Sequence, residues 1–232
     1  MTAPPAGRPH RSCRIAPSIL SADFAALADA IDGVAIETDL LHVDVMDGHF
    51  VPNLTIGPPV VSAIDHHTDL TLDCHLMMTN PGDYLEAFRS AGADWISPHV
   101  EVGGTAELLA EMRRMGVKAG LAISPETPFE AIAPWLGELD HVLVMTVRPG
   151  FGGQSFMGEV MPKLRQVADT IAARGYRAVI EVDGGIDPHT IAEAAGAGAT
   201  VFVAGSAVFN QPDPAEAVRT LRRLADRALA AP

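Results

Sequence analysis

Short apolar runs alternate with longer segments of helical period along the chain. The runs have the length of buried strands, while the longer segments carry apolar residues at the three- and four-residue spacing of one helix face. This alternation is typical of βαβ units built around a parallel sheet. We expect strands at Arg14–Leu20, Leu40–Met46, Leu70–Met77, Trp95–Val100, Val117–Ile123, His141–Thr146, Ala178–Asp183 and Thr200–Ala204.

The number of predicted strands indicates the architecture. Eight strands, each followed by a helix-compatible stretch, predict an α/β fold of the closed (β/α)8 or TIM-barrel type. Gly92-Ala93 and Gly198-Ala199 stand just before strands, as expected where a helix ends and the chain turns back. Helix starts, marked by a capping side chain or an early proline, are expected at Ser21-Ala-Asp, Pro81-Gly-Asp, Pro125-Glu-Thr-Pro and Asp187-Pro-His.

A doubly wound open sheet is the alternative α/β fold. Its dinucleotide-binding form carries a GxGxxG loop after the first strand. The segment Pro17-Ser-Ile-Leu-Ser-Ala-Asp contains no such loop, so the barrel is favoured. Catalytic groups of a (β/α)8 barrel collect at the carboxyl ends of its strands, which makes polar residues at those ends candidates for a site.

Composition agrees with a single barrel domain and restricts its ligands. Of the 232 residues, 48% are hydrophobic but only 5% are aromatic, which fits buried parallel strands rich in Ala, Val, Ile and Leu. A formal net charge of -13 argues against nucleic-acid or anionic-membrane partners. No apolar run approaches the roughly 20 residues of a membrane helix. Because the net charge is negative, any anionic ligand must be held by local groups.

The chain ends and the cysteines bear on organisation and location. We expect residues 15–232 to form the barrel, and residues 1–14, which contain prolines and basic side chains, to form a disordered extension. Cys13 and Cys74 lie in no CxxC spacing and are interpreted as reduced thiols, which favours the cytoplasm as the location.

Polar residues gather at the carboxyl ends of three predicted strands. His42 and Asp44 share one strand face because side chains alternate along a strand, and His75 and Asp183 stand near the ends of the third and seventh predicted strands. Imidazole nitrogens and carboxylate oxygens suit Zn²⁺, Mn²⁺ or Fe²⁺, and a cation compensates the burial of a carboxylate. On spacing alone, a metal site and a set of capping or hydrogen-bonding side chains are equal alternatives.

Glycines follow the last three predicted strands. The loop Pro149-Gly-Phe-Gly-Gly-Gln comes after the sixth strand, Gly184-Gly185 after the seventh and Gly205-Ser206 after the eighth. Glycine lets backbone N–H groups crowd an anion, and late-strand loops of barrels commonly bind phosphate. Tight turns without a ligand explain any one of these glycine motifs, so only the set indicates a phosphate site.

Five segments occur in the order typical of one enzyme family. They are Ala16-Pro-Ser-Ile-Leu-Ser-Ala-Asp-Phe, Leu41-His-Val-Asp-Val-Met-Asp-Gly-His-Phe-Val-Pro-Asn, Asp73-Cys-His-Leu-Met, Met145-Thr-Val-Arg-Pro-Gly-Phe-Gly-Gly-Gln and Glu181-Val-Asp-Gly-Gly-Ile. With these segments the chain resembles the ribulose-phosphate 3-epimerase family from Ile15 to about Phe209. The resemblance implies an isomerase of the pentose phosphate pathway. It would interconvert D-ribulose 5-phosphate and D-xylulose 5-phosphate by two-base proton transfer at C3 through a 2,3-enediolate.

The resemblance also implies a role for each candidate residue. His42, Asp44, His75 and Asp183 would bind one divalent metal per subunit, Zn²⁺ in the first place and Fe²⁺, Mn²⁺ or Co²⁺ as alternatives, and the two aspartates would also transfer the protons. Ser18 and His75 would contact the substrate. The substrate phosphate would be surrounded by Gly150, Phe151, Gly152, Gly153, Gly184, Gly185, Gly205 and Ser206. Met46, Met77 and Met145 would form a sulfur-lined wall, although ordinary core packing explains these methionines equally well.

Two segments near the predicted site carry less information. Arg148 stands where the family more often has Asn, Glu or Asp; a phosphate contact and a solvated side chain both fit it, the second better. The tripeptide His99-Val-Glu101 and the loop Met78–Tyr84 lie near strand ends, and the sequence assigns them no catalytic role.

Other functions remain to be weighed against the pentulose epimerase. D-Allulose-6-phosphate 3-epimerase runs the same chemistry on a longer sugar, but the paired glycines at 152–153 and 184–185 favour the pentulose enzyme. Decarboxylases and hexulose-phosphate synthases on similar barrels would leave the two His ligands surplus. The presence of both Asp44 and Asp183 disfavours a non-catalytic phosphosugar-binding barrel or a metal-storing scaffold. Family members assemble into dimers or hexamers, so a homo-oligomer is expected.

Overall fold

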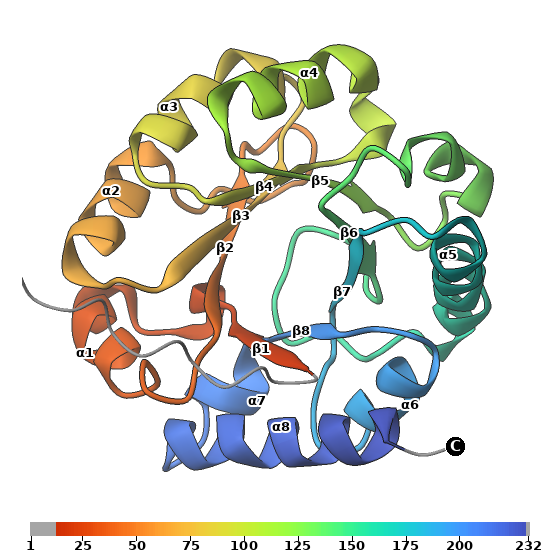
Figure 1. The fold of residues 1–232 in the computed structure, drawn as a ribbon. Helices are drawn as coiled ribbons and strands as arrows, with labels where there is room; N and C mark the ends of the chain where they lie inside the picture. Colours follow the sequence, from red (N-terminus) through yellow and green to blue (C-terminus); the bar gives the residue numbers. More distant parts are fainter. Residues whose placement is uncertain (1–12, 231–232) are drawn as a thin grey trace, which may run out of the picture.

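The computed structural model describes residues 13–230, in which eight parallel strands form a central ring with helices outside it (Figure 1). Each strand pairs with its neighbours in the order β1-β8-β7-β6-β5-β4-β3-β2. A parallel bridge between Ser18 and His42 joins the two remaining edges and confirms the predicted barrel. The strands are β1 (Arg14–Pro17), β2 (Leu40–Met46), β3 (Thr71–Met77), β4 (Trp95–Pro98), β5 (Lys118–Ile123), β6 (His141–Met145), β7 (Val179–Asp183) and β8 (Val201–Ala204).

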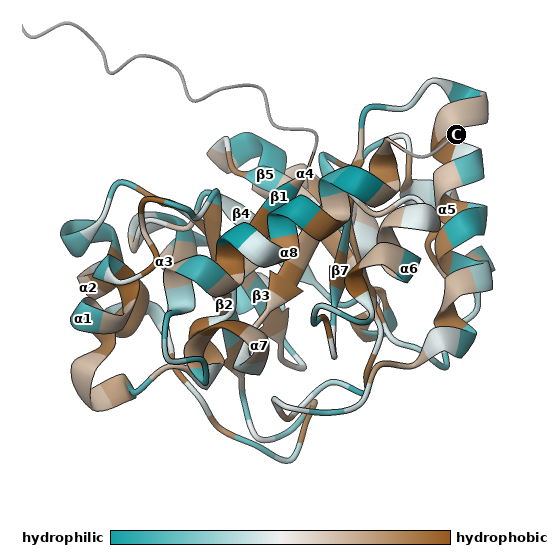
Figure 2. Ribbon diagram, turned by 90° about the horizontal axis from the view of Figure 1, so that it is seen from below, coloured by the Kyte–Doolittle hydropathy of each residue, from teal (hydrophilic) through white to brown (hydrophobic). Residues whose placement is uncertain are grey.

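Helices cover the outside of the ring. The α-helices are α1 (Leu27–Asp32), α2 (Pro58–His67), α3 (Leu85–Ser90), α4 (Thr105–Met115), α5 (Met161–Arg174), α6 (Ile191–Gly196), α7 (Ser206–Phe209) and α8 (Pro214–Leu229). Short 3-10 helices are η1 (Ile19–Ser21), η2 (Phe24–Ala26), η3 (Pro81–Asp83), η4 (Val100–Val102), η5 (Phe129–Ala131), η6 (Ala133–Trp135) and η7 (Gly158–Val160). The long helices α4, α5 and α8 alternate hydrophilic and hydrophobic residues (Figure 2), as expected of helices with one face on the sheet.

Three predicted strands end earlier than expected, β6 by one residue at Met145 and the other two by more. The first was expected to reach Leu20, but β1 stops at Pro17 because the Ser18 hydroxyl accepts the Leu20 N–H and starts η1. The fourth was expected to reach Val100, but β4 stops at Pro98 and the chain turns into η4. The early ends of β1 and β4 both lie at the carboxyl edge of the barrel and leave a polar side chain there.

The predicted helix after the fifth strand is wrong. Between β5 and β6 the structure has only η5 and η6, and the prolines at 128 and 134 remove backbone donors that a continuous helix needs. The Lys163 ammonium group of α5 binds the segment that follows β5. It donates to the carbonyl oxygens of Ser124, Pro125 and Thr127 at 2.6, 2.9 and 2.8 Å.

The other expected helix starts lie within or close to the predicted segments. Asp23, the last residue of Ser21-Ala-Asp, caps the first turn by accepting the Ala25 N–H. Pro81 begins η3 as predicted. Asp187 accepts the N–H groups of His189 and Thr190 just before α6. A capping side chain is therefore recognisable in the sequence, but the first helical residue is not.

The barrel begins slightly before the expected boundary. Residues 1–12 of the predicted extension lie outside the described residues, whereas Cys13 is fully buried and Arg14 already belongs to β1. Cys13 and Cys74 are both free and buried. Within residues 13–230, no helix has the length and apolar character needed to cross a membrane.

Alternation along the strands separates two apolar layers. Leu41 and Val43 of β2 belong to the large cluster that packs under the helices. Leu40, the residue before them, belongs to a smaller cluster with Ala16 and Val201 inside the ring. Every second residue of a strand therefore faces the barrel interior, and this alternation brings polar side chains of different strands together there.

Candidate active site

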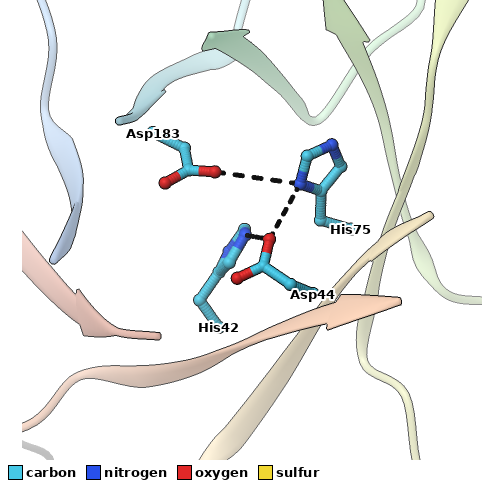
Figure 3. A group of neighbouring side chains, drawn as sticks. All are labelled: His42, Asp44, His75 and Asp183. Atoms are coloured by element: carbon cyan, nitrogen blue, oxygen red, sulfur yellow. Dashed lines mark hydrogen bonds and ion pairs between the residues drawn. The ribbon is translucent and has the colours of Figure 1, made fainter. Parts of the chain in front are cut away.

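Four side chains meet inside the barrel at the carboxyl ends of β2, β3 and β7 (Figure 3). One ligand atom of each of His42, Asp44, His75 and Asp183 lies within 4.8 Å of those of the others. Asp44 Oδ1 is 3.4 Å from His42 Nε2 and 3.2 Å from His75 Nδ1. Asp183 Oδ2 is 3.9 Å from the same His75 nitrogen. The sequence-predicted cluster is thus assembled from three strands.

A pocket of about 480 Å³ opens above this cluster. Both aspartates reach its floor, whereas the two histidines are fully buried beneath it. Ser18 also lines the pocket, and its hydroxyl donates to Asp44 Oδ2 at 2.6 Å. The pocket has room for a small phosphorylated metabolite. Because Asp44 Oδ2 binds Ser18, its other oxygen, Oδ1, faces the two histidines.

The two aspartates differ in proton affinity. Burial raises the pKa of Asp183 to about 7, and the charge of Asp44 adds to this effect. Burial alone would also raise the pKa of Asp44, but His42 and His75 lower it well below the ordinary range. Near neutral pH one carboxyl group is therefore ionised while the other holds a proton for part of the time.

The two histidines differ in the same way. Burial lowers the pKa of His75 to about 4, although Asp44 opposes this. Burial would also lower the pKa of His42, but the charges of Asp44 and Asp73 raise it well above the ordinary value. Near neutral pH His75 is thus uncharged, while His42 is held between two carboxylates.

The donor set fits a divalent metal. His42 Nε2 is buried and makes no well-directed hydrogen bond within residues 13–230, although Asp44 Oδ1 lies 3.4 Å away. Two imidazole nitrogens and two carboxylates form a ligand set that Zn²⁺, Fe²⁺ and Mn²⁺ all accept. A cation at this place satisfies the unpartnered nitrogen and compensates the two buried carboxylates.

A second polar layer lies below the cluster and was not predicted. Asp73 and Glu181 are fully buried, and Asp73 Oδ2 lies 2.6 Å from His42 Nδ1. Each stands two residues before a cluster residue, at 75 and 183, so it faces the same side of its strand. This two-residue spacing is visible in the sequence and could have identified both residues as neighbours of the cluster. Burial and Asp73 raise the pKa of Glu181 well above the ordinary value.

The predicted phosphate-binding loops border the pocket opposite the cluster. Gly150 to Gly153, Gly184, Gly185, Gly205 and Ser206 all line it. At Gly185 the backbone has φ +64°, and a Cβ would lie 2.4 Å from the Phe156 nitrogen, so only glycine fits. At these glycines the backbone itself borders the pocket, because there is no side chain in between.

The remaining predicted residues divide into pocket walls and exposed positions. Met46, Met77 and Met145 are almost fully buried and line the pocket. The Phe151 side chain also lines it but is 56% exposed. The Arg148 side chain is 74% exposed and pairs with Glu126 at 2.5 Å, while the residue also borders the pocket, so a solvated side chain and a phosphate contact stay alternatives.

Fold and site together define a class of protein: an α/β barrel whose pocket places two aspartates beside glycine-rich loops. A sequence profile of the ribulose-phosphate 3 epimerase family matches residues 14–209. Ribulose-phosphate 3-epimerase of Synechocystis sp. is 49% identical over 212 residues, which cover 90% of this chain and 92% of the relative. The Bacillus subtilis enzyme of the same name is 47% identical over 215 residues, covering 90% and 98%. The chain belongs to the ribulose-phosphate 3-epimerase family and is an isomerase.

Solved structures of more distant proteins share the barrel. The chain superposes on 3-keto-L-gulonate-6-phosphate decarboxylase from Vibrio cholerae with a TM-score of 0.69 at 20% identity, covering 93% of this chain and 98% of the other. For 3-hexulose-6-phosphate synthase from Salmonella typhimurium the TM-score is 0.67 at 18% identity, with 93% and 99% covered. At such identities the likeness shows the fold alone.

Proposed function

We propose that this chain interconverts D-ribulose 5-phosphate and D-xylulose 5-phosphate by moving a proton at C3 through a 2,3-enediolate. The observation that carries the proposal is the pair Asp44 and Asp183, which share His75 Nδ1 but differ in proton affinity. An epimerisation needs one group that accepts a proton and another that donates one. The names of the relatives support this substrate pair.

The two carboxyl groups divide the proton transfer. The ionised aspartate removes the C3 proton from one face of the sugar, and the protonated one returns a proton to the opposite face of the planar enediolate. In the reverse direction the roles exchange. The Ser18 hydroxyl, 2.6 Å from Asp44 Oδ2, orients that carboxylate and contacts the substrate.

His42, Asp44, His75 and Asp183 would hold one divalent metal per subunit, with Zn²⁺ as the first candidate and Fe²⁺, Mn²⁺ or Co²⁺ as alternatives. When bound, the cation supplies Lewis-acid stabilisation of the negative charge that develops on the sugar oxygens, which is worth several kcal/mol. The neutral imidazole of His75 is suited to this task, and His42 would bind through its unpartnered Nε2 after losing the proton that Asp44 and Asp73 favour.

The rest of the pocket positions the substrate. Backbone groups of the loops at 150–153, 184–185 and 205–206 surround the phosphate, together with the Phe151 ring. Met46, Met77 and Met145 exclude water from the enediolate and so limit stray protonation. The net charge of -13 makes these local contacts the means of holding an anion.

The proposal extends to assembly and location. We place the protein in the cytoplasm as a homo-oligomer, a dimer or a hexamer; a rice relative 46% identical over 218 residues is named a cytoplasmic isoform. D-Allulose-6-phosphate 3-epimerase and a non-catalytic phosphosugar-binding barrel are not favoured, because the matched relatives carry the name of the pentulose enzyme.

A coupled assay with D-ribulose 5-phosphate tests the proposal. Purified protein should form D-xylulose 5-phosphate, lose this activity on chelation and regain it with Zn²⁺, Mn²⁺ or Fe²⁺. D-Allulose 6-phosphate serves as the competing substrate. Turnover that survives complete removal of metal contradicts the metal role, and a higher kcat/KM for the hexulose contradicts the substrate assignment.

A further inference from the structure

A chain of polar contacts leads from the site to the outer edge of the barrel. His75 Nε2 lies 2.8 Å from His99 Nε2, and His99 Nδ1 lies 3.0 Å from Glu101 Oε2. His99 follows β4 and is fully buried, whereas the Glu101 side chain in η4 is 22% exposed. These are the two polar residues of the tripeptide to which the sequence assigned no role.

The chain fixes where protons reside. Two imidazole nitrogens in contact need one donor and one acceptor, and an ionised carboxylate only accepts. His99 Nδ1 lies 3.0 Å from Glu101 Oε2 and 3.3 Å from the Ser124 hydroxyl. Because the closer partner is a carboxylate, Nδ1 of a neutral His99 is the donor, and His99 Nε2 is then the acceptor in its contact with His75. His75 Nε2 therefore carries a hydrogen, and His75 Nδ1 keeps its lone pair.

That lone pair points at the centre of the candidate metal site. His75 Nδ1 faces Asp44 Oδ1 at 3.2 Å and Asp183 Oδ2 at 3.9 Å. A lone pair next to carboxylate oxygens is unfavourable unless a proton or a cation lies between them. Because His99 and Glu101 fix the tautomer of His75, the position between His75 Nδ1 and the two aspartates is suited to a cation.

Neighbouring groups keep this chain rigid. Glu101 Oε1 accepts the Ser124 N–H at 2.8 Å, and Lys163 holds the carbonyl oxygen of the same serine at 2.6 Å. The Phe50 ring packs on His99 with ring centroids 4.7 Å apart. Lys163 thus holds the serine that binds Glu101.

We propose that His99 and Glu101 are positioning residues which hold His75 in the Nε2-protonated tautomer and so prepare its Nδ1 atom for a divalent cation. The inference rests on the metal site of the proposed function. It assigns a task to a buried histidine that touches neither the pocket nor the reacting atoms.

Four variants test the proposal. His99→Leu removes the acceptor for His75 Nε2, and His99→Gln restores one through its amide oxygen. Glu101→Leu removes the outer carboxylate without altering either histidine. Glu107→Leu in the first turn of α4 removes an exposed carboxylate from the same part of the barrel and serves as the control. Thermal unfolding shows which variants are folded, and Glu101→Leu keeps the test open if His99→Leu does not fold.

The readouts are the tautomer of His75 and the affinity for Zn²⁺. Nitrogen-15 NMR of the metal-free protein should show His75 protonated at Nε2 in the wild type and in Glu107→Leu, and a tautomer mixture in His99→Leu. Competition with a chelator should show Zn²⁺ binding weakened about 10- to 100-fold in His99→Leu and Glu101→Leu. His99→Gln should recover most of that affinity.

Two outcomes overturn the inference. One is a wild-type His75 protonated at Nδ1, and the other is wild-type affinity for Zn²⁺ in folded His99→Leu and Glu101→Leu. A wild-type protein that binds no metal contradicts the proposed function instead, and the NMR measurement still decides which tautomer the chain imposes.

Discussion

Replacement of Asp183 by asparagine should abolish epimerisation and, at the same time, stabilise the metal-free protein above neutral pH. Burial and the charge of Asp44 raise the pKa of Asp183 from 3.8 to about 7. An aspartate with a raised pKa contributes stability while it is protonated, and this contribution is lost as the pH rises through about 7. The asparagine side chain is neutral at every pH, so the variant loses no stability through ionisation at this position.

The size of the effect follows from the difference between the two pKa values. A rise in pKa from 3.8 to about 7 lowers the free energy of unfolding of the wild type, relative to a side chain that stays neutral. The loss is about 4 kcal/mol at pH well above 7 and about 2 kcal/mol at pH 5. Between pH 5 and pH 8 the free energy of unfolding of Asp183→Asn should therefore gain about 2 kcal/mol on that of the wild type.

Urea unfolding of chelator-treated protein at both pH values measures this gain. Asp169→Asn, which removes an exposed carboxylate from α5, is the matched control and should show no comparable change. With saturating Zn²⁺ the order should reverse, because the wild-type carboxylate is then a ligand. A constant difference between Asp183→Asn and wild type from pH 5 to pH 8 would refute the reasoning about the buried carboxyl.

Further variants test the remaining parts of the pocket. Met145→Gln brings a polar amide to a buried wall and should lower kcat about 10-fold with little change in KM; unchanged turnover removes the water-excluding role. Arg148→Ala should leave KM within about twofold, because the exposed side chain pairs with Glu126, and a large rise in KM would reveal a phosphate contact made from the pocket edge. Gly185→Ala should destabilise the protein by about 2 kcal/mol more than Gly153→Ala in thermal unfolding, because both glycines have positive φ but only the first meets a backbone nitrogen at 2.4 Å. Equal losses in the two variants would contradict the steric argument.

The sequence predicts the barrel because its evidence is repeated along the chain. Each apolar run fits a strand by length alone, and eight of them restrict the architecture even where single boundaries are wrong. The ends of β1 and β4 were misplaced because hydrophobicity does not encode the backbone turns that begin η1 after Ser18 and η4 after His99. The helix after β5 was predicted wrongly because the prolines at 128 and 134 remove backbone donors that a continuous helix needs, and the segment forms only η5 and η6.

The candidate site was predictable in its residues but not in its electrostatics. Period-two alternation and the family segments indicate His42, Asp44, His75 and Asp183, and the structure brings all four together. The opposite proton affinities of Asp44 and Asp183 depend on burial and on contacts between strands, which have no signature along the chain. His99 and Glu101 reach the site only because His99 contacts His75 of another strand, so this connection becomes visible only in three dimensions.

Exchange of the C3 hydrogen in deuterium oxide tests most directly the claim that two aspartates act on opposite faces of the sugar. Asp44→Asn and Asp183→Asn should each lose epimerisation, while the aspartate that remains still exchanges the C3 hydrogen of one epimer and not of the other. The two variants should select opposite epimers. If both variants exchange the same epimer, or either one still epimerises at the wild-type rate, the two-base account is contradicted.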